Sequence, residues 1–272
     1  MSKICVRLMA LMLLVSFTVQ AEVSVPSIFG SRMVLQRGQA NPVWGWAAPG
    51  EKISVTFAGQ KHTATAGKDG AWRVKLQPLK ANAKGQTLTI QGSNKLELID
   101  VLVGEVWVCS GQSNMAWSVD RSYDPDLESL TAKFPNIRLI SVPPVGTQEP
   151  QKDFNGEWVA ASPESVMSFS AVGFFFGRTL HQAIDVPVGL IDNAWGGSAA
   201  EAWIRRDLLD KLPTAAPYMA TWRQTEANYD HEKTMATYET RLKKWQTAAA
   251  DARKAGKPVP QRPRNPRNPL TG

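Results

Sequence analysis

The sequence predicts an α/β protein in which an N-terminal β-sandwich precedes a domain built on a parallel sheet. Residues 34–98 contain short segments of alternating apolar and polar residues, separated by Gly, Pro and Asn, which is typical of sandwich strands. Residues 101–108 and 186–191 are instead almost continuously apolar, which is typical of buried parallel strands. A helical pattern before the second of these runs supplies the crossover connection that parallel strands need.

The β-sandwich is expected within residues 22–100. Its strand candidates are residues 34–36, 43–46, 53–57, 72–76, 88–90 and 96–98. Trp72 alternates in phase with Val74 and Leu76, which favours a place in the core. Trp44, Trp46 and Trp72 also fit an alternative interpretation, in which their rings form a surface that stacks on sugars.

Residues 101–117, VLVGEVWVCSGQSNMAW, read as a strand followed by an abrupt polar turn. We expect the strand to be buried on both faces and a helix to begin near Met115. Ser113 then lies at the carboxyl end of the strand, beside free N–H groups that stabilise negative charge. This is a nucleophile's position, although a polar turn without catalytic function fits the pentapeptide too. Cys109 is expected to be a small buried residue rather than a thiol nucleophile.

A second glycine-containing turn is expected at the same sheet edge. Residues 137–142 predict a strand, residues 169–181 a helix and residues 186–191 a further strand, so the crossover is right-handed and the strands are parallel. The following loop, which contains Gly196 and Gly197, then opens beside Ser113. The glycine N–H groups can bind an oxyanion, or the pair can simply form a tight turn.

The segment 111–115, GQSNM, resembles the first block of the SGNH hydrolases, in the form found in sialate O-acetylesterases. The sequence resemblance to this family extends over residues 25–51, 169–176, 186–192 and 195–203. The resemblance implies an SGNH or flavodoxin-like sheet and a serine esterase that removes O-acetyl groups from sialic acid or related carbohydrates. A polysaccharide acetylesterase of the xylan type is the alternative within this class, because the nucleophile block does not encode the sugar.

The same resemblance assigns roles to individual residues. Ser113 is the implied nucleophile, and the N–H groups of Ser113, Gly197 and Gly196 form the implied oxyanion hole. Trp117, Trp195 and Trp203 are candidates for binding the sugar, and packing roles fit them equally well. No metal or organic cofactor is required. The spacing of the acidic residues Asp120, Asp124, Asp126 and Glu128 favours a solvated loop over a metal site.

A base for Ser113 is missing from the sequence pattern. A serine hydroxyl needs a neighbouring base, normally a histidine oriented by a carboxylate. None of His62, His181 and His231 lies in the Asp-x-x-His block that closes SGNH domains, and the family's Trp-x-Gln-Gly-Glu block is absent too. The sequence therefore predicts a truncated SGNH domain with little or no esterase activity. A secreted carbohydrate-binding or adhesion module is the competing interpretation.

Export and charge complete the sequence-based expectations. Residues 1–21 combine Lys3 and Arg7 with an apolar run and a small-residue end, which predicts a secretory signal cleaved after Ala21 and a secreted or periplasmic protein. The chain carries +7, but nine Lys and Arg residues after Thr240, against Asp251 alone, give that segment +8. A basic nucleic-acid-binding surface over the rest of the chain is therefore not expected.

The predicted domain order follows from these segments. A signal peptide occupies residues 1–21, the sandwich residues 22–100 and the incomplete SGNH domain residues 101–203. Residues 204–272 are expected to form a helical insertion, interrupted near Pro213 and Pro217, and a Pro/Arg-rich end. A basic tail for anionic partners is the alternative for this last segment.

Overall fold

The computed structural model of the protein describes residues 22–266 and 268–269. The predicted signal peptide, residues 1–21, lies outside the described residues. Within the described ranges, no helix is both long and apolar enough to cross a membrane.

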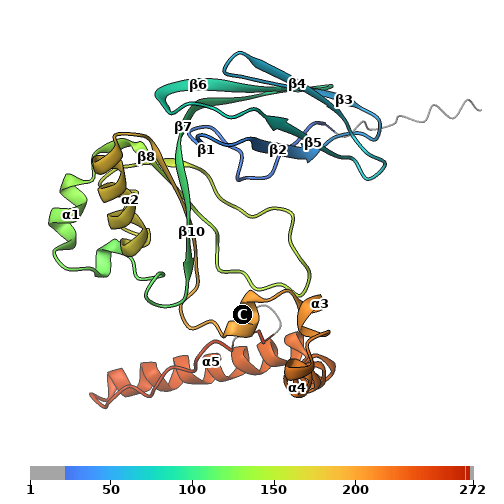
Figure 1. The fold of residues 1–272 in the computed structure, drawn as a ribbon. Helices are drawn as coiled ribbons and strands as arrows, with labels where there is room; N and C mark the ends of the chain where they lie inside the picture. Colours follow the sequence, from blue (N-terminus) through green and yellow to red (C-terminus); the bar gives the residue numbers. More distant parts are fainter. Residues whose placement is uncertain (1–21, 267, 270–272) are drawn as a thin grey trace, which may run out of the picture.

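The N-terminal half consists of two sheets that pack face to face (Figure 1). Its strands are β1 (Val34–Gln36), β2 (Asn41–Trp46), β3 (Lys52–Phe57), β4 (Gln60–Thr65), β5 (Ala71–Leu76), β6 (Asn82–Gln91) and the first part of β7 (Lys95–Gly111). Strands β2 and β5 pair with each other, and β4, β3, β6 and β7 follow in order in the larger sheet. Their inward side chains share one core, to which Trp72 contributes a ring that is 3% exposed, as its alternation predicted.

Strand β7 belongs to both halves of the molecule. Its first residues pair antiparallel with β6, and Leu102 to Gly104 pair parallel with β1. From Glu105 to Gly111 it pairs parallel with β10 (Val188–Ala194). The boundary expected at residue 100 therefore falls inside one uninterrupted strand, which Figure 1 shows descending from the sandwich beside β10.

The larger sheet continues from β7 through β10 to β8 and β9. The remaining elements are α1 (Pro125–Thr131), β8 (Phe134–Ser141), β9 (Val159–Ala161), α2 (Ala171–Ile184), α3 (Arg206–Leu209), α4 (Ala216–Asn228) and α5 (His231–Lys254), with short 3₁₀ turns at Val119–Arg121, Ala200–Trp203 and Pro213–Ala215. Strands β8 and β10 are parallel and α2 lies between them in sequence, so the predicted parallel pairing and intervening helix are confirmed.

Helix α2 packs closely on the part of the larger sheet formed by β7 and β10, because two of its residues are glycines. A Cβ on Gly173 would lie 2.8 Å from the Cys109 sulfur, and one on Gly177 would lie 2.6 Å from a Leu190 methyl group. Ser170 caps the helix by accepting a hydrogen bond from the Gly173 N–H at 3.0 Å. The helix start is thereby held directly over the strand that ends in the serine turn.

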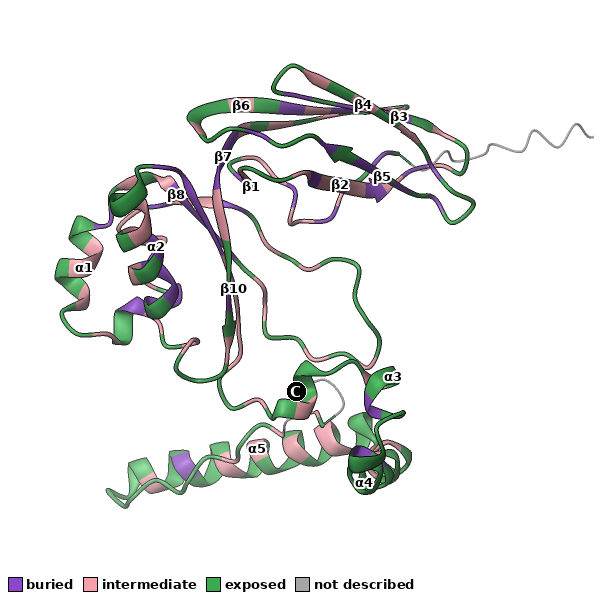
Figure 2. Ribbon diagram, viewed as in Figure 1, coloured by how far each residue is buried: buried purple, intermediate pink, exposed green. Residues whose placement is uncertain are grey.

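Two details of the sequence interpretation are wrong. Residues 101–104 are buried, but Trp107 is 44% exposed and Val108 is 61% exposed, so β7 is not buried on both faces over its whole length (Figure 2). On the exposed side of this end of β7, the Phe176 ring meets Trp107 edge to face. No helix begins at Met115 either: the serine turn closes a single helical bond, from the Ala116 N–H to the Gln112 carbonyl, and then ends.

The helical segment lies below the carboxyl ends of the strands (Figure 1). The interruption predicted near Pro213 is present as a 3₁₀ turn, whereas Pro217 lies in the first turn of α4, where its missing N–H costs no hydrogen bond. After α5 the proline-rich residues return along it: the Trp245 indole donates to the Pro260 carbonyl at 2.7 Å, and Arg262 lies over the same ring.

We predict that Gly104→Ala destabilises the fold. A Cβ at this position would lie 1.9 Å from the Pro187 carbonyl oxygen, at the point where β7 passes from β1 to β10. Overpacking of this kind typically costs about 1–3 kcal/mol in the free energy of unfolding. Chemical denaturation measures the change. Gly30→Ala is the matched control, because its Cβ would meet nothing closer than 3.7 Å; equal stability of the two variants contradicts the prediction.

Candidate active site

The serine turn projects from the end of β7 into solvent. Gly111 is the last residue of the strand, and Gln112, Ser113 and Asn114 are all exposed. The turn is supported from below, because the Ser170 hydroxyl at the start of α2 contacts the Met115 sulfur at 3.4 Å. An exposed hydroxyl on a supported turn is accessible to a substrate, as a nucleophile must be.

The glycine loop after β10 lies directly against this turn. Parallel pairing sets Ala194 opposite Gly111, so the two loops leave the sheet at the same level. A Cβ on Gly196 would lie 3.5 Å from the Ser113 Cα and 3.6 Å from its Oγ. The side of Ser113 that faces the loop is therefore open because residue 196 has no side chain.

Two hydrogen bonds join the serine turn to the glycine loop, and a third lies within the glycine loop. The Trp195 N–H donates to the Gly111 carbonyl at 2.9 Å, which extends the strand pairing by one residue. The Gln112 side chain donates to the Ser198 carbonyl at 2.8 Å, and the Ser198 hydroxyl donates to the Trp195 carbonyl at 2.7 Å. The separation of Ser113 from the glycines is thus fixed by the backbone and by Gln112, to which the sequence interpretation gave no role.

Several backbone N–H groups around the hydroxyl have no acceptor in the described chain. Those of Ser113, Asn114 and Met115 precede the single helical bond of the turn, and those of Gly196 and Gly197 lie between two bonded residues of the loop. Gly197 has φ +81°, a left-handed conformation that favours glycine. Unpaired N–H groups from two loops that meet at one serine are the chemical basis of an oxyanion hole.

None of the three histidines hydrogen-bonds to Ser113 in the described residues. His62 lies on β4 and contacts Gln60, and His181 lies on α2, where its Nδ1 contacts the Val186 carbonyl. His231 starts α5 and contacts the Tyr229 hydroxyl at 3.0 Å. Among the described residues, no histidine is therefore placed to act as a base on the hydroxyl.

Comparison with known proteins identifies the family. The family model described as carbohydrate esterase, sialic acid-specific acetylesterase, matches residues 103–257. The chain belongs to this family. The human sialate O-acetylesterase is 34% identical over 197 residues, and the rat enzyme is 32% identical over 203 residues.

A solved structure supports the same conclusion. A carbohydrate acetylesterase from Xanthomonas citri is 38% identical, with a TM-score of 0.65 over 67% of this chain. The match covers 42% of that structure, and the human and rat enzymes are matched over 38% of their length. The chain thus spans about two fifths of the length of these acetylesterases.

Of the three tryptophans considered for sugar binding in this acetylesterase-family chain, two lie beside the glycine loop. Trp195 and Trp203 line a common hollow, and the Trp203 indole donates to the Ser198 hydroxyl at 2.9 Å. Trp117 does not line this hollow; its indole donates to the Arg121 carbonyl at 2.7 Å, and the residue is 51% exposed. The structure therefore groups Trp195 with Trp203 and leaves Trp117 apart.

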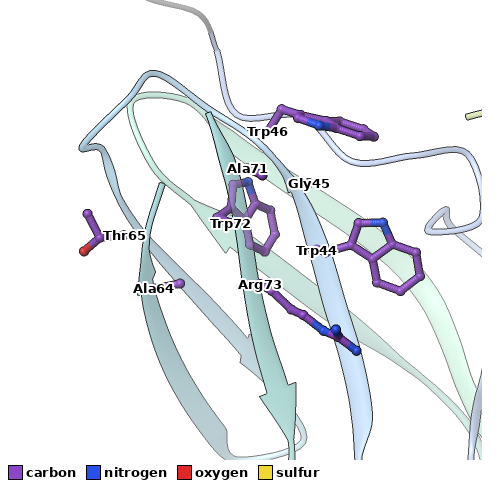
Figure 3. A pocket seen from close by; sticks show the side chains of 8 residues that line it. All are labelled: Trp44, Gly45, Trp46, Ala64, Thr65, Ala71, Trp72 and Arg73. Carbon is purple, nitrogen blue, oxygen red and sulfur yellow. The ribbon is translucent and has the colours of Figure 1, made fainter. Parts of the chain in front are cut away.

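The sandwich tryptophans form a shallower hollow of about 480 Å³ (Figure 3). Trp72 belongs to the core beneath it, since its ring packs over Gly45. Trp44 meets Phe29 edge to face at 4.6 Å, and Figure 3 shows Arg73 extending toward Trp44 from the neighbouring strand. Only Trp46 of the three thus remains without a ring partner or a core position among the described residues.

Asp192 is a half-buried acid on β10 that the sequence interpretation treated only as a loop residue. The backbone N–H groups of Ser170 and Ala194 favour its charged form, while its Oδ1 has no hydrogen-bond partner in the described chain. Burial raises the pKa of this carboxyl. Burial, and to a lesser extent the charge of Asp192, raises the pKa of the neighbouring Cys109 thiol to about 11.

We predict that Cys109 is inert in the folded protein. With its pKa near 11 and the residue 4% exposed, almost no accessible thiolate exists at pH 8. Iodoacetamide labelling of a Cys5→Ser variant, in which Cys109 is the one remaining thiol, should be undetectable under native conditions and complete in guanidinium chloride. Rapid labelling of Cys109 under native conditions would contradict this prediction and would support the alternative that its thiol is a nucleophile.

Proposed function

We propose that this chain carries the nucleophile and the oxyanion site of a serine esterase that removes O-acetyl groups from carbohydrates. The observation that carries the proposal is the approach of the glycine loop to Ser113, 3.5 Å at Cα and 3.6 Å at Oγ for a Cβ built on Gly196. Membership of the acetylesterase family supports the same chemistry.

The proposed reaction is a two-step acyl transfer. The Ser113 oxygen attacks the acetyl carbonyl carbon, and its proton passes to solvent while the carbonyl oxygen becomes an oxyanion. N–H groups of Ser113 and Gly197, with Gly196 as a further donor, stabilise that charge. Collapse of the intermediate releases the sugar hydroxyl, and water then frees acetate from the acyl-enzyme. None of the protein groups named here requires a metal, and no cluster of three potential metal-binding residues occurs in the described chain.

The proposal includes slow turnover. No histidine contacts Ser113 in the described residues, so the proton of the attacking hydroxyl passes to solvent rather than to a positioned base. We also propose that residues 1–21 direct export and that the protein is secreted or periplasmic, because this segment has the composition of a signal peptide. Sialic acid and neutral polysaccharides are both candidate substrates.

Ser113 is predicted to react covalently with a probe for nucleophilic serines. A fluorophosphonate probe should label the protein at Ser113, located by peptide mass spectrometry, because the hydroxyl is exposed and N–H groups of its own turn and of the adjoining glycine loop are unpaired in the described chain. Ser113→Ala should abolish this labelling. Ser110→Ala is the matched control, since Ser110 is also exposed and lies three residues earlier, on β7. Equal labelling of wild type and Ser113→Ala, or none in either, would refute the proposal.

The two glycines are predicted to respond differently to alanine. The Gly196→Ala methyl group would occupy the space beside the Ser113 Oγ and obstruct the approach of the probe, so labelling should slow without loss of stability, since its contacts of 3.5–3.8 Å are ordinary van der Waals distances. The Gly197→Ala methyl group would meet nothing within 4 Å, but φ +81° costs about 1–2 kcal/mol for an L residue. Labelling rates and thermal denaturation separate the two effects; unchanged labelling in Gly196→Ala contradicts the site geometry.

A further inference from the structure

A hollow of about 570 Å³ adjoins the glycine loop on the side away from α2. Its walls are residues 142–150 after β8, the chain that follows β10, and helices α3 and α4. Figure 1 shows the segment after β8 descending to α3 before it returns to the sandwich. A volume within about 300–1,000 Å³ is typical of sites that bind small molecules.

Hydrogen bonds connect the lining of the hollow to the turn that carries the proposed nucleophile. Gln112, next to Ser113, holds the Ser198 carbonyl, and the Ser198 hydroxyl accepts from the Trp203 indole at 2.9 Å. Ser198 and Trp203 both line the hollow. A substrate whose acetyl group reaches Ser113 therefore has neighbouring space to extend into.

Four aromatic side chains are part of the lining. Trp203 and Tyr218 are each 41% exposed, and both line the hollow, together with Trp195 and Trp222. The Trp222 indole donates to the Gln148 side chain at 3.3 Å, which joins α4 to the segment after β8. Exposed rings that are fixed in place at a hollow offer apolar faces, and sugar rings present matching C–H surfaces.

The charges of the lining are unfavourable for an anionic sugar. Both arginines that line the hollow are already engaged by carboxylates: Arg205 pairs with Asp207 through two bonds of 2.9 Å. Arg206 makes a two-pronged pair with Glu226, and this hydrogen bonding raises the arginine's pKa.

The remaining charged residues of the lining are acidic. They are Glu149 and Glu201, neither of which forms a salt bridge among the described residues. Among the described lining residues, a ligand carboxylate would meet these two acids and no unpaired cation, so its desolvation would not be offset.

We propose that this hollow binds neutral sugar units adjacent to the acetylated residue, so that the substrate is a neutral acetylated oligosaccharide rather than a free sialic acid. The inference rests on the proposed function of Ser113 for the place of the acetyl group. It commits Trp203 and Tyr218 to stacking on the neighbouring sugar units. It also decides between the two substrate classes that the nucleophile motif leaves open.

Binding of defined sugars to the full chain tests the proposal. Isothermal titration should show that partially O-acetylated xylotetraose binds more tightly than 9-O-acetyl-N-acetylneuraminic acid. Trp203→Ala and Tyr218→Ala should each weaken oligosaccharide binding by about tenfold, the effect expected for loss of one aromatic contact. Tyr218→Ala is the decisive variant, because Tyr218 makes no side-chain hydrogen bond in the described residues and its loss leaves the glycine loop anchored.

Trp46→Ala is the matched control, since it removes a half-exposed tryptophan from the sandwich. Unchanged binding in this variant supports the proposal, and lost binding moves the sugar site to the sandwich and overturns it. Tighter binding of the sialic acid, or wild-type affinity in both Trp203→Ala and Tyr218→Ala, overturns it as well. Probe labelling of Ser113 is scored separately: labelling without oligosaccharide binding rejects this inference alone, and binding without labelling rejects the esterase proposal alone.

Discussion

The parallel pairing of β7 with β10 is the constraint on which the candidate site depends. Residues 111 and 194 are cross-strand partners, so the serine turn and the glycine loop begin at the same height on the sheet. A shift of one residue in this register would turn the side chains of β10 to the opposite face and displace the loop from Ser113. The pairing starts at Glu105, beside Gly104, where only a residue without Cβ fits against the Pro187 carbonyl.

The same strand, β7, links the sandwich to the candidate site. Glu105 accepts a bond of 2.6 Å from Arg37 and a second from Gln36, so the end of β1 is tied to the first residue that pairs with β10. These hydrogen bonds lower the pKa of the Glu105 carboxyl, because they stabilise its charged form. The sign is that of a depressed acid: the stability it contributes at neutral pH is lost as the pH falls through its folded-state pKa. The sandwich is thus coupled to the site by an internal strand and not only by a linker.

Much of the architecture was predictable, because the local pattern of apolar and polar residues along the sequence indicates which side chains are buried. The alternation around Trp72 and the apolar run of β10 each predicted the correct strand and the correct buried side. Strand β4 was missed, since its sequence QKHTAT has a half-exposed pattern with no large apolar residue, and only pairing with β3 makes it a strand. The exposure of Trp107 was also unpredictable, because the β-propensity of a run does not say which neighbours will cover it.

The candidate site likewise has features that the sequence predicts and features that it does not. Ser113 and the glycine pair could be placed at one sheet edge from the order strand, helix, strand, because parallel topology brings successive carboxyl ends together. The Gln112 bond, the orphan oxygen of Asp192 and the wall made by residues 142–150 and α4 depend on tertiary contacts without a local signal. The pairing of Arg206 with Glu226 is of this kind, and it decides the charge that a ligand meets.

A serine with oxyanion donors but no contacting base has a definite energetic meaning. In triad hydrolases, removing members of the triad leaves about 10³–10⁴-fold acceleration over water, which comes from the oxyanion hole and from binding. If Ser113 acts as proposed, the described residues hold the parts responsible for that remainder: unpaired N–H groups at Ser113 and Gly196, and an adjacent hollow. Since these parts are fixed by sheet register and backbone hydrogen bonds, they are preorganised without a histidine. A base brought within reach of the exposed Ser113 hydroxyl would then act on a site whose other half is already assembled.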